Sequence, residues 1–320
     1  MTLQEIIDLS RQRLFDTKGI DSKRKWPDWE LVAYANDAER ALARCALEPL
    51  KDSDTIGYLT LSGTTGQVTS VSVSSVVITS GAVTFSTNLA NTAANLAANI
   101  NAFTSAPRYR AVARGSLVII KATAQTGYPV GGYSLAAAVV SMAAAVTNLP
   151  GLCRHVVAIG QRILTLDSRV IRIKRFKPSS QTQPIALYTK GDMDATLPGW
   201  EAQTSAAISL AIPDYEGSEI TLVPASNTVE LIEQDVVRLP LIDFVSTNMT
   251  AMPEVPVRYH ETLIEWIMRV AYRKNDVETL DLARSQTHEA EFNRRIEEFR
   301  VQDIRKSPDN KVNRPPLGML

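Results

Sequence analysis

Cysteine and long apolar runs are scarce in this chain of 320 residues. Its two cysteines, Cys45 and Cys153, stand far apart without CxxC spacing. A disulfide framework is therefore not expected, and both thiols are predicted to be small buried side chains in a reducing compartment. The longest apolar tract, Leu135–Val146, is too short to cross a bilayer, and the charged N-terminal residues are not typical of a signal peptide.

Histidine is equally scarce, which limits metal and acid–base chemistry. The chain has three histidines, at His155, His260 and His288. His260 begins a motif like that of a zinc-protease helix, but Ile264 stands where the second histidine is required, and His288 fails in the same way at Phe292. No GxSxG, GxxxxGK[ST] or GxGxxG motif occurs. We therefore expect no catalytic residue, no metal site and no cofactor.

Net charge is absent as well, because 34 Lys and Arg balance 34 Asp and Glu. Such a chain has no global electrostatic attraction to nucleic acid or to an anionic membrane. The charges are distributed unevenly, since residues 57–148 contain no Asp or Glu and only four basic residues. Alternating β-branched residues with glycine at the turns predict strands here, with one covering helix over Thr87–Phe103. We interpret 57–148 as an inserted β-rich domain.

The N-terminal part of the chain predicts two amphipathic helices, over residues 2–16 and from Pro27 to about Glu48. Thr2 and Glu5 have capping-box spacing, which allows each side chain to accept from a backbone N–H at the helix start. The second helix carries an apolar stripe of residues spaced by three and four: Leu31, Ala35, Ala38, Leu42 and Cys45. Both stripes need a partner to cover them.

Residues 256–299 predict two further amphipathic helices, joined by a short break at Lys274-Asn275. Asp276 is expected to cap the second of them. An antiparallel pair of helices cannot bury its apolar stripe alone. We therefore expect the two ends of the chain to form one helical bundle, with the middle of the chain projecting from it.

A small antiparallel sheet is predicted between the two pairs of helices. One of its strands, Val170–Phe176, lies in a basic stretch with five cationic residues: Arg169, Arg172, Lys174, Arg175 and Lys177. One interpretation is contact with nucleic acid or an acidic partner. The other is a solvated basic face beside an acidic neighbour such as Asp192 or Asp194. The sequence leaves both interpretations open.

These patterns predict an α+β fold: a helical bundle built from both chain ends, a small antiparallel sheet and an inserted strand-rich α+β domain. The main domain would be discontinuous, comprising 1–56 and 149–300. Residues 301–320 are rich in proline and polar residues, and we expect an extended tail that becomes ordered only against a partner. Without an active-site constellation, this organisation favours an assembly protein over an enzyme.

Several stretches in this order resemble the head-to-tail adaptor, or connector, proteins of tailed bacteriophages. They are LQEIIDLSRQRLFD and WPDWELVAYANDAERALAR, then LDSRVIRIKRFK and LYTKGDMDATLPGW, and finally PVRYHETLIEWIMRVAYRKNDVETLDLARSQTHEAEF. The resemblance covers roughly residues 1–56 and 150–300, about two thirds of the chain. The stretch 57–148, with TAANLAANINAF, is similar to small domains found in phage tail and adaptor proteins.

The resemblance implies a structural protein of the virion, at the head-to-tail junction, assembled in the host cytoplasm. Such adaptors form a ring, usually of twelve copies, below the portal protein. The ring extends the DNA channel and carries the downstream tail tube or nozzle protein. Packaged DNA would pass through without specific binding, and 57–148 would face outward, where a tail fibre could attach.

The resemblance also suggests roles for individual residues. Portal binding is expected of the C-terminal segment, with Arg305, Lys306, Lys311, Arg314, Leu317 and Leu320 as candidates. Candidates for subunit contacts or for the channel lining are Arg172, Lys174, Arg175, His260, Glu261, Arg269 and Arg273.

Two other hypotheses remain beside the adaptor. In the first, the protein is a receptor- or glycan-binding tail module that uses 57–148. In the second, it is a cell-wall hydrolase that uses carboxylates such as Glu261 or Glu265. The helices at both chain ends favour the adaptor, because a free binding module has no need of them.

Overall fold

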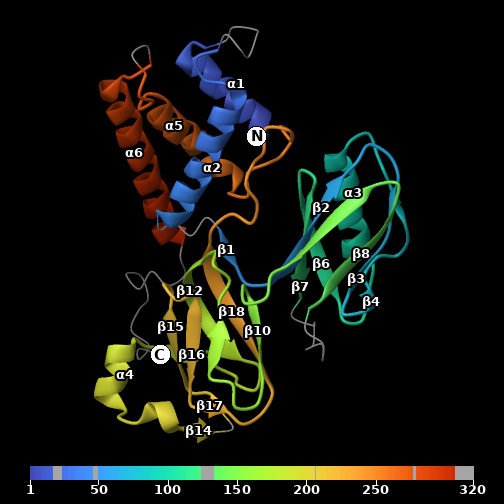
Figure 1. Cartoon of the computed structure of the whole chain (residues 1–320), viewed down its shortest axis with the longest axis vertical. Coiled ribbons are helices and arrows are strands. Elements are labelled where there is room, and N and C mark those ends of the chain that lie inside the picture. Colours follow the sequence, from blue (N-terminus) through green and yellow to red (C-terminus); the bar gives the residue numbers. More distant parts are fainter. Residues whose placement is uncertain (17–23, 46–49, 124–132, 206, 277–278, 307–320) are drawn as a thin grey trace, which may run out of the picture. The chain divides into compact units, whose positions relative to one another are not determined.

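The computed structural model describes residues 1–16, 24–45, 50–123, 133–205, 207–276 and 279–306, with side chains through residue 302. The described residues form six α-helices and several small sheets that are mostly antiparallel (Figure 1). The chain divides into two compact units. A helical unit comprises Met1–Pro49 and Pro240–Leu320, and a β unit comprises Leu50–Leu239.

The helical unit begins with α1 (Leu3–Leu14) and α2 (Asp28–Arg44). The capping box predicted for α1 is confirmed, since the Thr2 hydroxyl accepts from the Glu5 N–H and the Glu5 carboxylate accepts from the Thr2 N–H. On α2 the predicted stripe is buried at Leu31, Ala35, Ala38 and Leu42, while Cys45 is half-buried. The apolar spacing therefore identified the inward face of this helix.

The C-terminal part of the helical unit contains α5 (His260–Ala271), preceded by one 3₁₀ turn η3 (Val257–Tyr259), and the long helix α6 (Leu282–Lys306). Helix α5 packs against α1, α2 and α6, which Figure 1 shows side by side. Asp276 does not cap α6, which begins five residues later than that cap requires. Its cap is Asp281, whose carboxylate accepts from the Arg284 N–H at 3.0 Å.

The β unit holds a four-stranded sheet around the long strand β18 (Glu230–Arg238). Strand β18 pairs antiparallel with β1 (Lys51–Asp52), β10 (Arg154–Val157) and β12 (Val170–Pro178). A second sheet has the order β11 (Ile163–Thr165), β16 (Glu219–Val223), β15 (Leu210–Asp214), β13 (Ala186–Leu187), with β13 and β15 parallel.

Two smaller helices and a short strand pair complete this part of the β unit. Helix α4 (Lys190–Thr196) is capped by Thr189 and leads into the 3₁₀ turn η2 (Trp200–Ala202). Strands β14 (Thr204–Ser205) and β17 (Ala225–Ser226) pair in parallel. A local core holds this corner together, formed by Met193, Trp200, Ile212 and Val223.

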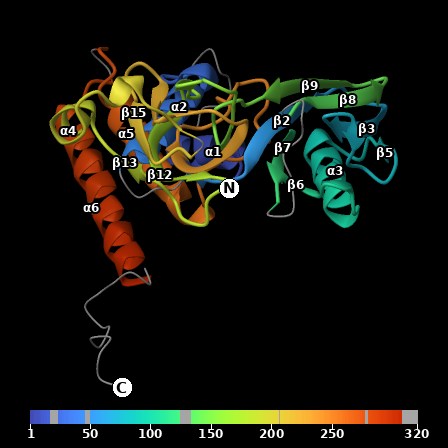
Figure 2. The ribbon, with the colours of Figure 1, turned by 90° about the horizontal axis from the view of Figure 1, so that it is seen from below.

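Residues 57–148, which contain no Asp or Glu and are called the acid-free stretch below, form most of two further sheets and α3 (Leu89–Ala102). One sheet has the order β6 (Tyr109–Arg114), β7 (Leu117–Ala122), β2 (Thr55–Ser62), β9 (Ala143–Asn148). In the other, β3 (Gln67–Val73) pairs with β4 (Val76–Val77), β5 (Val83–Thr84) and β8 (Leu135–Val140). Figure 2 shows α3 beside β6 and β7.

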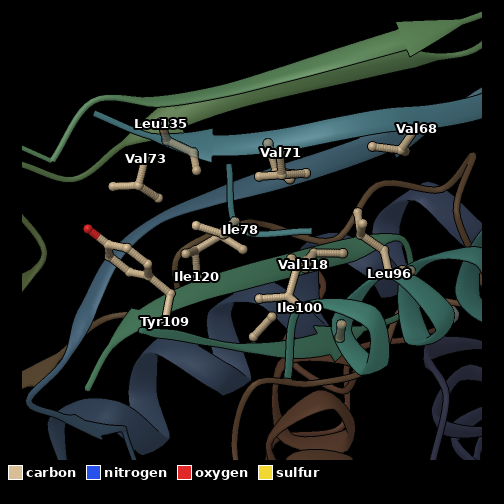
Figure 3. Packing of buried hydrophobic residues seen from close by; sticks show 14 of the residues in the cluster. Val68, Val71, Val73, Ile78, Leu96, Ile100, Tyr109, Val118, Ile120 and Leu135 are labelled. Atoms are coloured by element: carbon tan, nitrogen blue, oxygen red, sulfur yellow. The ribbon is translucent and has the colours of Figure 1, made fainter. Parts of the chain in front are cut away.

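The acid-free stretch has a hydrophobic core of its own. Valines of β3 and Leu135 of β8 point toward Val118 and Ile120 of β7, and Leu96 and Ile100 of α3 close the core from the helix side (Figure 3). The apolar tract 135–146, which the sequence allowed as strand or helix, is two strands with a turn at Ser141, whose φ is 57°. The boundaries 57 and 148 of an inserted domain remain a prediction.

Candidate interaction surfaces

His260, one of the candidates for subunit contacts, is buried inside the helical unit with 1% of its surface exposed. Its Nε2–H donates to the carbonyl of Val255 at 3.1 Å, and its Nδ1 accepts from the amino group of Met1 at 3.0 Å. Both ring nitrogens therefore have partners within the chain. The structure gives this histidine a role in joining the start of α1 to the start of α5.

Of the other candidates, Glu261 and Arg269 lie where α5 meets α6, and Arg273 follows the end of α5. Arg269 forms an ion pair with Glu289 at 3.0 Å and stacks on the Trp266 ring, 4.2 Å from the ring centroid. Glu261 is exposed and pairs with Arg295 at 3.0 Å. The exposed Arg273 side chain has no hydrogen bond or ion pair with any residue that the structure describes. Of the four α5-side candidates, Glu261 and Arg273 are thus the most accessible.

Glu265, which the sequence raised as a hydrolase carboxylate, is the centre of an ion-pair cluster that joins α1, α5 and α6. Its side chain is 5% exposed and contacts Arg13 at 2.6 Å, His288 at 2.8 Å and Arg295 at 3.5 Å. Burial raises the pKa of Glu265, but hydrogen bonds from His288 and Arg13 outweigh burial and lower it. A lowered pKa keeps this carboxylate ionised and suits a structural ion pair better than a general acid.

The basic strand β12 presents its candidate cations to solvent at two positions. Arg172 and Lys174 are exposed, and Arg175 is half-buried. Two register shifts against β18 interrupt the alternation of the strand, which explains why Ile173 and Phe176 are the buried residues between the cations.

The acidic residues near β12 lie on its neighbour β18. Asp235 is the register partner of Arg175, and Glu233 is the register partner of Lys177. Asp192 and Asp194, the neighbours considered from the sequence, have local partners in and around α4: Asp192 completes the cap at Thr189, and Asp194 accepts from the Trp200 indole at 2.9 Å. In register, the acidic neighbours of Arg175 and Lys177 are thus Asp235 and Glu233, and the choice between the two interpretations of the basic strand stays open.

The candidates for portal binding lie at the end of α6 and beyond it. The helix includes residues 301–306, which the sequence had assigned to an extended tail. The backbones of Arg305 and Lys306 belong to the last turn of α6, whereas Lys311, Arg314, Leu317 and Leu320 lie outside the described residues. Their role in portal binding stays a prediction.

One buried charge cluster had no signal in the sequence. The Asp52 carboxylate, 2% exposed, accepts from Arg238 Nε at 3.0 Å and from the Thr55 hydroxyl at 2.7 Å, and Lys121 Nζ lies 3.5 Å away. Burial raises the pKa of Asp52, but Arg238, Lys121 and Thr55 together outweigh burial and lower it to about 2. The cluster joins β1 and β18 to β7, strands far apart in the chain.

Within the described part of the chain, no three His, Cys, Asp or Glu side chains are grouped so that they could hold a metal ion. His155 is buried beside Phe176, and burial lowers its pKa to about 4, so it is neutral at pH 7. Among the described helices, none has the length and apolar character needed to cross a bilayer.

In the part of the chain that the structure describes, charged clusters thus join helices and strands that are distant in sequence. The sequence model of the SU10 adaptor protein family matches residues 135–315, more than half of the chain. The protein therefore belongs to the SU10 adaptor protein family and is a phage adaptor, a structural component of the virion. The chain matches no curated protein.

The extent of the match differs from the extent of the resemblance seen in the sequence. The match begins at residue 135, within the stretch interpreted as an insertion, and continues into the C-terminal segment as far as residue 315. Helices α1 and α2 and the strands and helix from β2 to β7 precede it. The family assignment thus rests on β8 to β18 and on the helices α4, α5 and α6.

Proposed function

We propose that this protein is a structural head-to-tail adaptor that forms a ring, usually of twelve copies, below the portal of a tailed phage. The ring extends the DNA channel and provides the platform for a downstream tail tube or nozzle protein. The helical bundle from both chain ends forms the ring wall. The observation that carries the proposal is the family match, which includes α5, α6 and the start of the C-terminal segment.

The shape of the α5–α6 pair supports a role for the C-terminal segment in reaching a partner. Tyr259 and Phe299 stack edge to face at 4.8 Å, an aromatic contact that joins the start of α5 to α6. Beyond it, Arg300, Val301 and Gln302 are exposed. With 25 residues against 12, α6 is about 37 Å long and α5 about 18 Å long, so α6 continues well past its partner.

The charge of the chain supports a channel through which DNA slides. Lys and Arg that neutralise phosphates hold DNA through counterion release, and a chain with zero formal net charge limits such contacts. We propose Arg172, Lys174, Arg175, Glu261, Arg269 and Arg273 as contacts between copies or as channel lining. His260 supports the wall from within the unit rather than at its surface.

A deletion of Pro308–Leu320 tests the portal-binding role of the C-terminal segment. We expect the truncated protein to keep its circular dichroism spectrum and to lose co-sedimentation with portal particles. The matched control carries the same thirteen residues in scrambled order, which keeps length and charge. Normal co-sedimentation of the truncated protein would show that portal binding lies elsewhere.

The alternative is a receptor- or glycan-binding role of 57–148. One observation favours it: this stretch has its own hydrophobic core, as a separate binding domain needs. We propose 57–148 as an inserted domain that projects outward, where a tail fibre or a glycan could bind. Excision of 57–148 with a short linker should leave a folded helical unit by circular dichroism. Glycan-array binding by the full chain that disappears on excision would support the alternative over the adaptor.

A further inference from the structure

A polar cavity of about 630 Å³ lies in the β unit between the β6–β7 hairpin and the sheet built on β18. Four arginines line it. Two come from the start of β6 and the residue just before it, one from β10 and one from β12: Arg108, Arg110, Arg154 and Arg175. Guanidinium groups from three parts of the unit therefore converge on one concave surface. The acid-free stretch contributes half of them, although it contains only four basic residues.

Three residues of the cavity lining, Asp54, Arg154 and Glu233, are held by ion pairs or hydrogen bonds. Lys121 of β7 pairs with Asp54 at 3.0 Å, and Arg154 of β10 donates to the Tyr133 hydroxyl at 2.8 Å. The Arg154 side chain is 7% exposed and forms an ion pair with Glu233 at 3.1 Å. These contacts fix the positions of the side chains of Asp54, Arg154 and Glu233 in the cavity lining.

Two of the four cavity arginines, Arg110 and Arg175, have side chains that form no such contact within the described residues. Neither Arg110, which is exposed, nor Arg175, which is half-buried, makes a side-chain hydrogen bond or ion pair with any residue that the structure describes. Arg175 faces Asp235 across the β12–β18 pair, yet no ion pair joins them in the described residues. A ligand that entered the cavity would meet two guanidinium groups ready to donate.

The acidic residues of the lining decide which anion fits. Asp54 and Glu233 are occupied by Lys121 and Arg154, whereas Asp235 has no such partner among the described residues. Guanidinium groups bind carboxylates and phosphates with two parallel hydrogen bonds. An uncompensated carboxylate such as Asp235 repels any anion whose oxygens only accept, so the ligand must also bring a donor. A polypeptide has backbone N–H groups beside its carboxylates, whereas a phosphodiester backbone has no donor.

We propose that this cavity binds a carboxylate-bearing polypeptide segment of a partner protein. Asp or Glu side chains of the segment pair with Arg110 and Arg175, and a backbone N–H or a basic side chain of the segment donates to Asp235. The volume lies within the range of ligand pockets, which is roughly 300–1,000 Å³. The inference does not require the ring or portal binding by the C-terminal segment.

Fluorescence anisotropy with the full-length chain tests the proposal. The probe is a fluorescein-labelled eight-residue peptide of alternating Asp and Gly, and its comparison is the same peptide with Asn in place of Asp. We expect the Asp peptide to bind, and R110Q and R175Q each to weaken its binding at least tenfold. Arg114→Gln is the matched control, because Arg114 lies on the same strand β6 outside the cavity lining and should leave binding unchanged.

A labelled oligothymidine of eight nucleotides separates peptide recognition from general attraction to anions. The proposal requires the Asp peptide to bind more tightly than the oligonucleotide at the same salt concentration. It is overturned if the wild-type chain does not bind the Asp peptide, or if R110Q and R175Q, folded by circular dichroism, bind it like the wild type. Equal or tighter oligonucleotide binding that is lost in R110Q would also overturn it and assign the cavity to nucleic acid.

Discussion

The helical unit and the acid-free stretch 57–148 stabilise their folds in different ways. In the helical unit, ion pairs join segments that are distant in sequence: Lys274 contacts Glu30 at 2.8 Å, and Arg13 contacts Glu265 at 2.6 Å. In 57–148 no carboxylate side chain exists, so its interior depends on apolar burial and backbone pairing. We therefore expect the stability of the helical unit to depend on its charged side chains, and that of 57–148 to depend on them much less.

The start of the helical unit shows how these ion pairs set geometry. Arg11 is 4% exposed, pairs with Asp16 at 3.1 Å and with Asp28, and donates to the carbonyl of Trp26 at 2.7 Å. One guanidinium group thus connects the end of α1 to the beginning of α2. Removing one partner of such a buried pair leaves an uncompensated charge, which makes the cluster costly to break.

The acid-free stretch uses its cations differently. Lys121 forms ion pairs with Asp52 and Asp54, which lie in the segment just before residue 57. The pKa of Lys121 is lowered by burial, but Asp52 and Asp54 outweigh burial and raise it. These ion pairs therefore connect the stretch to the rest of the β unit, while its own core is apolar.

The largest expected effect comes from the core of the acid-free stretch. Leu96→Ala removes a fully buried side chain of α3 and should destabilise this region by about 2–5 kcal/mol through lost burial and the cavity left behind. Asn95→Ala, on the exposed side of α3, is the matched control. Hydrogen exchange should show lost protection in β2, β3, β6 and β7 with α5 unchanged. Equal loss of protection in α5 would contradict the separation of the two regions.

A smaller effect is expected from the charge cluster of the helical unit. Glu265→Gln keeps the shape of the side chain and removes the carboxylate that Arg13, His288 and Arg295 share. We expect a loss of about 1.5–3 kcal/mol in the free energy of unfolding, the range for hydrogen bonds to charged groups. Urea unfolding followed by tryptophan fluorescence measures it, with Glu297→Gln on the exposed side of α6 as control. A change equal to that of the control would mean that the cluster does not stabilise the bundle.

Acid should destabilise the helical unit before it destabilises the acid-free stretch 57–148. Because the folded-state pKa of Glu265 is lowered, its contribution is fully present above the unfolded-state pKa near 4.3 and is lost as pH falls through the folded value. The acid-free stretch has no carboxylate side chain to protonate. Hydrogen exchange between pH 6 and pH 3, corrected for intrinsic rates, should therefore show α5 losing protection before β7. If β7 lost its protection at a higher pH than α5, the helical unit would not be the more acid-sensitive part.

The smallest effect is expected on the surface of α6. Arg294 is exposed and pairs with Glu291 and Glu298 on the same helix. Exposed pairs of this kind contribute little, because water weakens them and salt screens them. Arg294→Ala should therefore lower the unfolding free energy by less than Glu265→Gln does, and the difference from the wild type should shrink in high salt. A loss comparable to that of Glu265→Gln would show that α6 stabilises the unit through its outer face.

Local patterns in the sequence predicted much of the fold because each depends on neighbouring residues. The capping box at Thr2, the stripe on α2 and the hairpin of β6 and β7 all follow from spacing over a few positions. The start of α6 was misplaced because two acidic residues compete as caps. Asp276 instead accepts, through its carbonyl, from the N–H groups of Thr279 and Leu280 in the connection before the helix.

Long-range pairing was not predictable from a single sequence. The later start of α6 shifts the register of the helix pair, so that Arg269 meets Glu289 and Glu265 meets His288. Likewise, Asp52 and Arg238 are separated by 186 positions, and only the pairing of β1 with β18 brings them together. The convergence of the cavity arginines was not predictable for the same reason, since they come from segments of two different sheets.

Native mass spectrometry of the full-length protein mixed with purified portal particles tests the central claim most directly. We predict one complex that contains the portal and a closed ring of this chain, with a mass increment of about twelve copies of 35.1 kDa. Negative-stain images of the same sample should show added density on one face of the portal. A chain that remains monomeric in the presence of portal would contradict the adaptor function.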